Sequence, residues 1–177
     1  MAAKKKTAAK SAPKAKTKEA VAMRGPKVGA KAPGFSMPTA GGGTVSLASL
    51  KGKNVVVYFY PKDDTPGCTK EACGFNEMLA QFRKVDAEIV GISRDPMKSH
   101  DRFAAKYGLK FHLASDEDGK ASAAYDTWIE KSMYGRKYMG LERSTYLVDK
   151  AGIIRAVWRP VSVTGHVEEV LAAAKGL

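Results

Sequence analysis

The sequence predicts one α/β domain with a mixed central sheet and helices on both of its faces. Two apolar runs rich in β-branched residues, 54–60 (NVVVYFY) and 88–93 (EIVGIS), are typical of strands that are buried on both faces. Helix-like segments follow the runs, and this alternation is characteristic of a sheet with crossover helices. A strand–turn–strand pattern at 144–160 adds an antiparallel hairpin, which makes the sheet mixed.

The first 25 residues are expected to form a disordered basic tail, with 26–177 as the folded domain. Residues 1–25 are rich in Lys and Ala and hold no aromatic residue, so they bury too little apolar surface to offset the entropy of ordering. Residues 1–27 carry a net charge of +8, out of +12 for the whole chain. Such a tail is a solubilising extension, a targeting segment or a polycation that contacts nucleic acid nonspecifically.

The elements of the domain follow in order from Pro26. Strand-like pieces at 35–37 and 44–46 predict an N-terminal β-hairpin that leads into a short helix at 47–50. Pro61 ends the first buried strand. Apolar spacing predicts the later helices at 69–85, 99–107, 121–125 and 167–175, and a short strand at 112–116.

Composition excludes several classes of protein. The 177 residues are 44% hydrophobic, which is enough for one domain with a core. We find no apolar run of the roughly 18–20 residues that a membrane helix needs. The first residues lack the apolar stretch of a secretory signal, and two cysteines do not make a disulfide scaffold. We therefore expect a cytoplasmic protein in a reducing compartment, without membrane contact.

The stretch PKDDTPGCTKEAC, residues 61–73, contains both cysteines of the chain. In open α/β sheets, functional residues gather just beyond the carboxyl ends of the strands, and Cys68 follows such a strand. It also opens a predicted helix, where free backbone N–H groups and the positive end of the dipole stabilise a nucleophilic thiolate. The hydroxyl of Thr65, three residues earlier, can hold a small polar oxygen beside the sulfur.

Cys73 lies five residues after Cys68. If both are helical, they point to different faces and their Cα atoms lie roughly 8–9 Å apart. A disulfide needs about 4.4–6.8 Å between Cα atoms, so the pair cannot bond while the helix is intact. Either the two cysteines never bond, or the first turns of the helix unwind.

Other interpretations of the cysteine pair fit less well. A zinc site needs about four ligands, usually in close pairs, and the three histidines are scattered along the chain. The C-x₄-C spacing differs from the C-x-x-C of thioredoxin-like redox motifs. An inert buried cysteine is the ordinary alternative for any cysteine, but the strand–Pro–Thr–Pro–Gly–Cys context argues against it.

The stretch from Pro61 to Cys68 resembles the PxxxTxxC motif of peroxiredoxins. Its continuation CTKEAC is similar to the bacterioferritin comigratory protein (PrxQ) subfamily, whose resolving cysteine lies five residues after the peroxidatic one. A second block, 134–145 (YGRKYMGLERST), resembles another segment of that subfamily. The resemblance covers about 26–177, excludes the basic tail, and implies a thioredoxin-like fold.

The resemblance implies a role for five residues. Cys68 would be the peroxidatic nucleophile and Cys73 the resolving cysteine. Thr65 would hydrogen-bond both the peroxide and the thiolate. Arg143 would lie over Cys68, stabilise its thiolate and polarise the O–O bond of the peroxide. Pro61 would shape the pocket and shield the thiol.

The same resemblance implies a thiol-dependent peroxidase that reduces hydrogen peroxide and organic hydroperoxides. Cys68 would become a sulfenic acid and then form an intramolecular disulfide with Cys73, which thioredoxin or a similar dithiol would reduce. The resemblance implies a monomer and no metal or organic cofactor. Two other hypotheses stay open: a thiol–disulfide oxidoreductase or redox sensor that oxidises client proteins, and a protein tethered to nucleic acid by residues 1–25.

Overall fold

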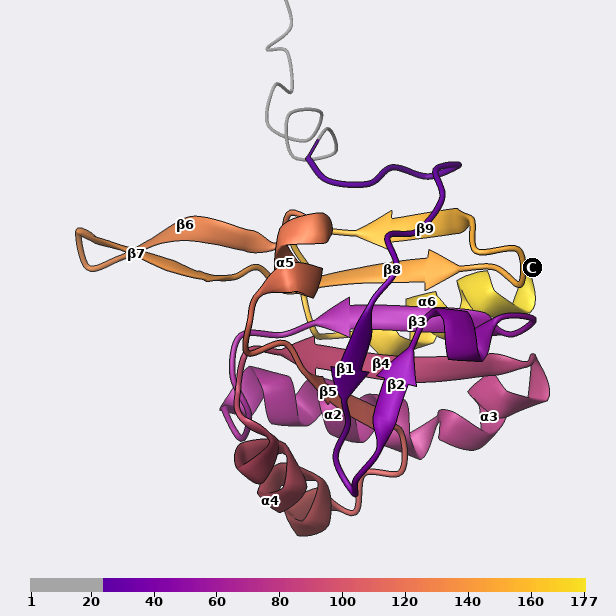
Figure 1. Cartoon of the computed structure of the whole chain (residues 1–177), viewed down its shortest axis with the longest axis horizontal. Coiled ribbons are helices and arrows are strands. Elements are labelled where there is room, and N and C mark those ends of the chain that lie inside the picture. Colours follow the sequence, from indigo (N-terminus) through magenta and orange to yellow (C-terminus); the bar gives the residue numbers. More distant parts are fainter. Residues whose placement is uncertain (1–23) are drawn as a thin grey trace, which may run out of the picture.

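The computed structural model describes residues 24–177, which fold around a five-stranded mixed sheet (Figure 1). The strands are ordered β5-β4-β3-β8-β9. β3 and β5 run parallel to β4, whereas β8 runs antiparallel to β3 and β9. The bounds are Asn54–Phe59 for β3, Ala87–Ser93 for β4, His112–Ser115 for β5, Ser144–Val148 for β8 and Ile154–Trp158 for β9. The predicted mixed sheet and its late hairpin are confirmed.

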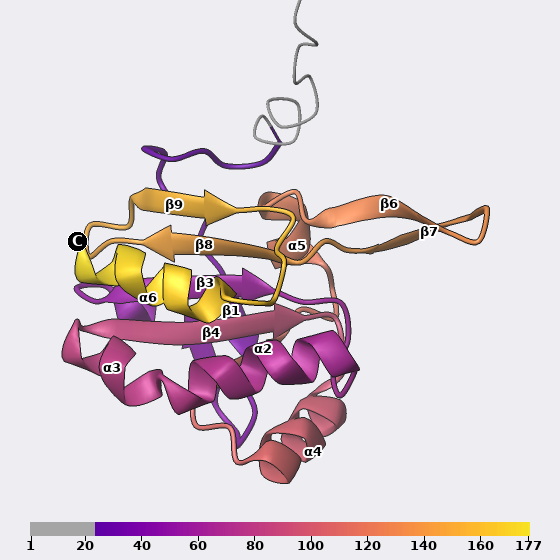
Figure 2. The same ribbon diagram turned by 180° about the vertical axis from the view of Figure 1, so that it is seen from behind.

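Helices cover both faces of the sheet, as predicted. Figure 2 shows α2, α3 and α6 in front of the sheet, and Figure 1 shows α5 on the opposite face together with the N-terminal hairpin. α4 lies at the edge formed by β5. The helices span Pro66–Glu77 (α2), Leu79–Lys84 (α3), Met97–Tyr107 (α4), Lys120–Ala124 (α5) and His166–Lys175 (α6).

The N-terminal hairpin is confirmed and packs across the sheet. β1 (Ser36–Pro38) pairs antiparallel with β2 (Thr44–Ser46), and a 3-10 turn, η1 (Ala48–Leu50), follows. Met37 and Val45 face each other in this hairpin and are both buried. The hairpin therefore covers the apolar face of the sheet that α2, α3 and α6 leave open.

The central strand β3 is buried along its whole length, which explains its unbroken apolar sequence. Tyr58 packs into the core on the side of α2 and α6, against Phe75. Phe59 packs into the core on the other side, against Tyr125. Burial of each such side chain contributes about 1.5–3 kcal/mol, so β3 holds the two layers together.

The single helix predicted at 69–85 is wrong in two respects. α2 already begins at Pro66, because a proline fits the first turn of a helix, where its missing N–H is not needed. The helical stretch then breaks at Met78, whose backbone (φ −94°, ψ 4°) ends α2 and starts α3. Cys68 therefore lies inside the first turn of α2.

A two-stranded hairpin at 128–141 was not predicted. β6 (Trp128–Met133) and β7 (Arg136–Leu141) pair antiparallel at six positions and project from the body as the β6–β7 arm (Figure 1). Tyr134 and Gly135 join them with φ of 51° and 75°, the positive values that a type I′ turn requires. The sequence hides this hairpin because the arm is mostly exposed on both faces and lacks the usual alternation of apolar and polar residues.

The predicted basic tail and its contact with nucleic acid fall almost wholly on residues 1–23, outside the described part of the chain. The described chain begins at Arg24, whose Nε lies 3.3 Å from Oδ2 of Asp126. Arg159 donates to the carbonyl oxygen of Arg24 over 3.2 Å. None of the helices in 24–177 has the length and apolar character needed to cross a membrane.

Candidate functional site

Cys68 lies just past the carboxyl end of β3, as predicted. It is the third residue of α2, and its side chain is buried, with 1% of the residue exposed. Thr65 is the N-cap, and its carbonyl oxygen accepts the first helical hydrogen bond from the N–H of Thr69, at 2.8 Å. The positive end of the helix dipole therefore points at the sulfur, which favours a thiolate.

Arg143 reaches the sulfur from the neighbouring strand. In the antiparallel pair β3–β8, Ser144 lies opposite Phe59, so the residue before β8 lies beside the loop after β3. Nη2 of Arg143 donates to Sγ of Cys68 over 3.3 Å. Gly67 leaves room for this approach, because a Cβ there would lie 3.1 Å from Nη2. The fold thus brings together two of the residues that the sequence analysis singled out.

Glu71 completes this arrangement and was missed in the sequence. Its Oε2 atom accepts from Nη1 of Arg143 at 2.5 Å, and its side chain is fully buried. Burial raises the pKa of Glu71 to about 7, and Arg143 opposes the shift. An acidic residue three positions after a helical cysteine lies on the same face, and this spacing was the available clue. One guanidinium therefore serves both the thiol and a buried carboxyl.

The polar atoms behind this group have few partners. Within residues 24–177, neither Oε1 of Glu71 nor the hydroxyl of Tyr58 has a hydrogen-bond partner, and both are buried. Burial raises the pKa of Tyr58 well above its usual value, and the charge of Glu71 acts in the same direction. The phenol of Tyr58 therefore stays neutral.

Thr65 and Pro61 shape the loop before α2 rather than contact the sulfur of Cys68. The hydroxyl of Thr65 donates to the carbonyl oxygen of Lys62 over 2.9 Å and tightens the loop before α2. Pro61 is exposed and, with Lys62, lines a hollow of about 370 Å³ at the base of the β6–β7 arm. The loop therefore forms one side of an opening beside the active-site residues.

Cys73 lies one and a half turns further along the same intact helix. Both cysteines are free thiols, Cys68 buried and Cys73 half-buried. Burial raises the pKa of Cys73, and Glu77 adds to the shift. Cys73 is therefore a protonated thiol at neutral pH.

A buried polar network anchors the loop between β3 and α2. The carboxylate of Asp63 accepts from Tyr60 (2.6 Å) and Ser99 (2.8 Å) and lies 2.7 Å from Nδ1 of His100. Nε2 of His100 lies 3.1 Å from the carbonyl oxygen of Ala114 on β5. The sequence offered no clue to this network, because its members come from three separate segments.

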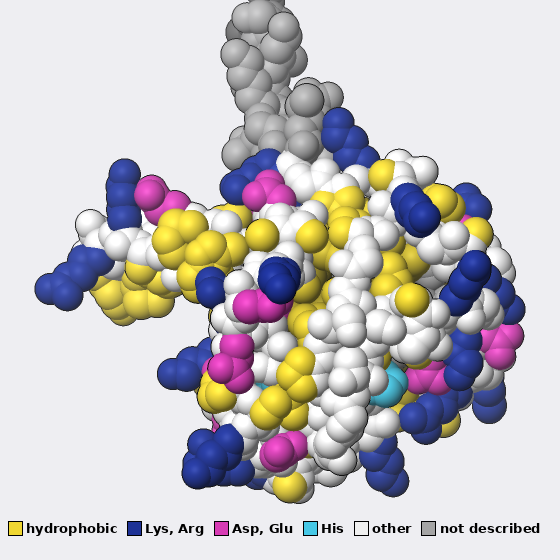
Figure 3. All heavy atoms as spheres, viewed as in Figure 1, with side chains coloured by type: hydrophobic (Ala, Val, Ile, Leu, Met, Phe, Trp, Pro, Cys, Tyr) yellow, Lys and Arg dark blue, Asp and Glu magenta, His cyan; other side chains and the backbone are white. Residues whose placement is uncertain are grey.

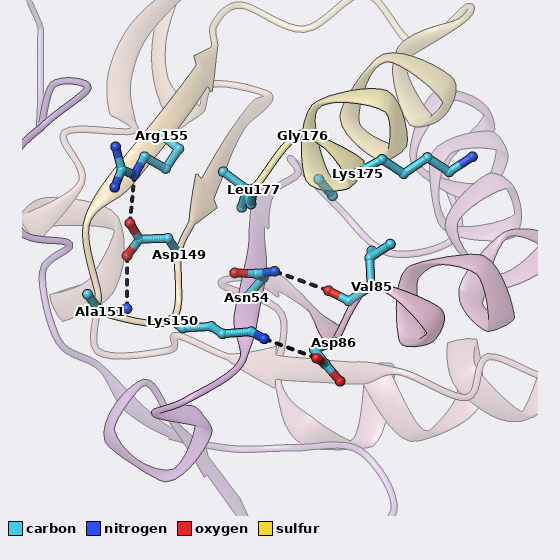
Figure 4. Close-up of a pocket in the computed structure, with 11 residues that line it drawn as sticks. Asn54, Val85, Asp86, Asp149, Lys150, Ala151, Arg155, Lys175, Gly176 and Leu177 are labelled. Carbon is cyan, nitrogen blue, oxygen red and sulfur yellow. Dashed lines mark hydrogen bonds and ion pairs between the residues drawn. The ribbon is translucent and has the colours of Figure 1, made fainter.

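A larger hollow, of about 660 Å³, lies at the opposite end of the sheet from Cys68 (Figure 4). Asn54, the first residue of β3, lines it. Four of its charged side chains form two pairs, Lys150 with Asp86 (3.0 Å) and Arg155 with Asp149 (2.6 Å), and Lys175 also lines it. Neither cysteine lines this hollow, whereas Pro61 of the loop before α2 lines the smaller one. In the described chain, no group of three or more His, Cys, Asp or Glu side chains is placed to hold a metal ion.

Comparison with known proteins identifies the family of the chain. Residues 28–157 match the AhpC/TSA family. The chain is 51% identical to a putative peroxiredoxin bcp of Coxiella burnetii, over 82% of this chain and 96% of that protein. It is 44% identical to peroxiredoxin Bcp of Bacillus subtilis, over 85% and 96% of the two chains.

Solved structures show the same fold. Peroxiredoxin Q of Xanthomonas campestris superposes with a TM-score of 0.77 at 46% identity, over 80% of this chain and 90% of that one. A mutant of Xylella fastidiosa PrxQ superposes with a TM-score of 0.80 at 40% identity, over 85% and 96% of the two chains. The chain therefore belongs to the AhpC/TSA family and is a peroxiredoxin of the Bcp (PrxQ) type, a thiol peroxidase.

Proposed function

We propose that Cys68 is the peroxidatic nucleophile, that Arg143 is its electrostatic partner and that Cys73 resolves the oxidised thiol. The observation that carries this proposal is the 3.3 Å contact between Nη2 of Arg143 and Sγ of Cys68 at the start of a helix. A guanidinium keeps its charge and offers several donors in a fixed plane. It can therefore stabilise both the attacking thiolate and the negative charge that develops on the leaving oxygen.

The first step oxidises the sulfur by two electrons. The thiolate of Cys68 attacks the terminal oxygen of ROOH, an S–O bond forms and the O–O bond breaks. The leaving RO⁻ takes up a proton and departs as ROH, or as water when the substrate is hydrogen peroxide. Cys68 is left as a sulfenic acid.

The second step joins the two cysteines. The sulfur of Cys73 attacks the sulfenic sulfur of Cys68, and hydroxide leaves with the thiol proton as water. Because a helical spacing of five residues holds the Cα atoms roughly 8–9 Å apart, the first turns of α2 must unwind before the bond can form. A dithiol protein such as thioredoxin then reduces the disulfide by thiol–disulfide exchange.

The substrate class includes organic hydroperoxides as well as hydrogen peroxide. A solved structure of the Xanthomonas campestris bacterioferritin comigratory protein is described in terms of alkyl peroxide reduction. In this chain, the apolar side chains of Trp128 and Leu141 line the opening beside Pro61, which suits an alkyl group. All reacting residues come from one chain, so a monomer is sufficient, and the reducing cytoplasm supplies the dithiol.

The test is NADPH-coupled peroxide consumption with thioredoxin and thioredoxin reductase, in the intact protein and in the Cys68→Ser and Cys73→Ser variants. We expect Cys68→Ser to be inactive. We expect Cys73→Ser to react once and to accumulate a Cys68 sulfenic acid, which dimedone labelling and mass spectrometry detect. Full activity of Cys68→Ser would overturn the peroxidatic role. Undiminished turnover of Cys73→Ser would overturn the resolving role.

A further inference from the structure

We propose that the β6–β7 arm is the docking surface for the protein dithiol that reduces the Cys68–Cys73 disulfide, and that this partner presents an acidic rim around an apolar contact. The proposal rests on the function proposed above, since it names the partner of the same site. The exposure, position and charge of the arm support the proposal, together with the change in α2 that the disulfide requires.

The arm gathers exposed apolar side chains. Six large apolar residues in 24–177 are exposed, and four of them belong to the arm: Met133 (56%), Tyr134 (99%), Tyr138 (43%) and Met139 (50%). Figure 3 shows hydrophobic side chains along the arm with Lys and Arg side chains beside them. Tyrosine and methionine are enriched at protein interfaces, where methionine adapts to different partners. The exposed side chains of the arm therefore have the composition that is typical of a contact surface.

An isolated two-stranded ribbon is at best marginally stable in water. Six cross-strand pairs join β6 to β7, from Trp128 opposite Leu141 to Met133 opposite Arg136. No third strand joins this ribbon within the described part of the chain. A partner that covers the apolar side chains of the arm removes their exposure and stabilises the complex.

The arm is placed at the redox site. Figures 1 and 2 show that it leaves the body at the end where β3 finishes and α2 starts. Tyr138 and Met139 line the hollow of about 370 Å³ that Pro61 also lines, and Arg143 follows β7 by two residues. Burial lowers the pKa of Lys131 on β6, and Arg143 adds to this shift. A protein seated on the arm therefore reaches the loop that carries Cys68.

A reducing partner suits this surface because the arm stays folded while α2 changes. The disulfide forms only after the first turns of α2 unwind, so the oxidised protein offers no intact helix there for recognition. The strands of the arm pair with each other and not with α2. The pairing of the arm therefore does not depend on α2, and a partner can recognise the arm while the first turns of the helix are unwound.

The charge of the arm selects an acidic partner. The arm carries Lys131, Arg136 and Lys137 against one acid, Glu130, and its base adds Lys62 and Arg94 against Asp95. Glu130 and Lys137 form an exposed ion pair at 3.6 Å. Two basic residues of the arm remain, so its net charge is positive. Complementary charge raises the rate at which the two proteins associate and makes that rate depend on the salt concentration.

The experiment uses the full chain with the paired change Met133→Thr and Tyr134→Asn. Thr suits a strand, and Asn before Gly135 gives the favoured sequence of a type I′ turn, so the arm keeps its fold while losing apolar surface. We expect the KM for thioredoxin to rise at least about tenfold, equivalent to about 1.4 kcal/mol. The rate constant for peroxide with the reduced protein, and turnover with dithiothreitol, should stay at the wild-type value.

Two further variants sharpen the test. Val28→Thr removes an equally exposed apolar side chain (60%) outside the arm and should leave the KM for thioredoxin unchanged. Arg136→Glu combined with Lys137→Glu should slow reduction by thioredoxin and abolish the fall of its rate constant with added salt.

Several results would overturn the docking proposal. The first is an unchanged KM for thioredoxin in the arm variant, and the second is an equal loss with thioredoxin and dithiothreitol, which would place Met133 and Tyr134 in the peroxide site instead. The third is a wild-type dimer that the arm variant dissociates without a change in KM, which would make the arm a contact between copies. Absence of peroxide turnover by the wild type with either reductant would instead refute the proposed function.

Discussion

Nη2 of Arg143 lies 3.3 Å from Sγ of Cys68, although 75 residues separate them in the chain. The register of β3 against β8 brings them together, because it sets Ser144 opposite Phe59. Nη1 of the same guanidinium donates to the buried carboxyl of Glu71. The thiol of Cys68 and the carboxyl of Glu71 thus share one cation.

Replacement of Arg143 by Ala should reduce the rate constant for peroxide at least about hundredfold, because loss of one preorganised donor costs about 10²–10³ in rate. Arg143→Lys should recover only part of it, since an ammonium cannot contact Cys68 and Glu71 with two fixed donors. Stopped-flow oxidation of the pre-reduced protein measures the rate constant for peroxide of each variant. Arg155→Ala, at an exposed pair on β9, is the control and should match the wild type. A wild-type rate for Arg143→Ala would rule out its role.

Glu71→Gln should change how stability depends on pH. The pKa of Glu71 is about 7 in the folded protein, raised by burial from its ordinary value of 4.5. Between these values the folded state binds more protons than the unfolded state, so the group's contribution to stability falls as pH rises through this window. The free energy of unfolding of the wild type, relative to Glu71→Gln, should therefore drop by about 3 kcal/mol between pH 4.5 and pH 7 and level off above.

Urea unfolding at a series of pH values measures this difference. Titratable groups that both proteins share contribute equally to the two free energies of unfolding and cancel in the difference. One of them is His166, whose pKa is lowered by burial to about 4. Glu77→Gln, at an exposed position of the same helix, serves as the control and should not change the pH dependence. If the difference between wild type and Glu71→Gln does not vary with pH, Glu71 does not titrate in this range.

Thr65→Ser should keep the peroxide rate, whereas Thr65→Val should lower both rate and stability. The valine removes the hydrogen bond to the carbonyl oxygen of Lys62, which contributes about 0.5–1.5 kcal/mol. It also loosens the loop that sets the start of α2. Denaturant unfolding and stopped-flow oxidation test this, with Thr69→Val as a control inside the helix. Equal rates in all variants would show that the hydroxyl is not needed.

Asp63→Asn and the neighbouring Asp64→Asn should behave very differently. Asp63 is buried, accepts from Tyr60 and Ser99 and lies 2.7 Å from Nδ1 of His100, and a buried polar group that loses its partner costs about 1–3 kcal/mol. Asp64 is exposed, and its pair with Lys106 should contribute little. Thermal or urea unfolding distinguishes the two. Equal stability of both variants would mean that the network around Asp63 does not anchor the loop before α2.

The sequence predicted the elements that local pattern determines. The apolar run of β3, the N-terminal hairpin and the late hairpin appear where expected. The position of Cys68 at the start of a helix also followed from the chain alone, because the strand, the proline and the turn residues are contiguous. Local propensity and spacing act over a few residues, so these features are readable without the fold.

Other features depend on contacts between distant segments. The pair of Glu71 with Arg143 and the network of Asp63 with His100 join residues 72 and 37 positions apart, and only the strand order brings them together. The β6–β7 arm was missed because its exposed faces carry no burial pattern. The sequence by itself therefore determined the strands of the central sheet, the N-terminal hairpin, most of the helices and the position of Cys68. The tertiary structure decided which charges surround that thiol, because burial and strand register are properties of the assembled sheet.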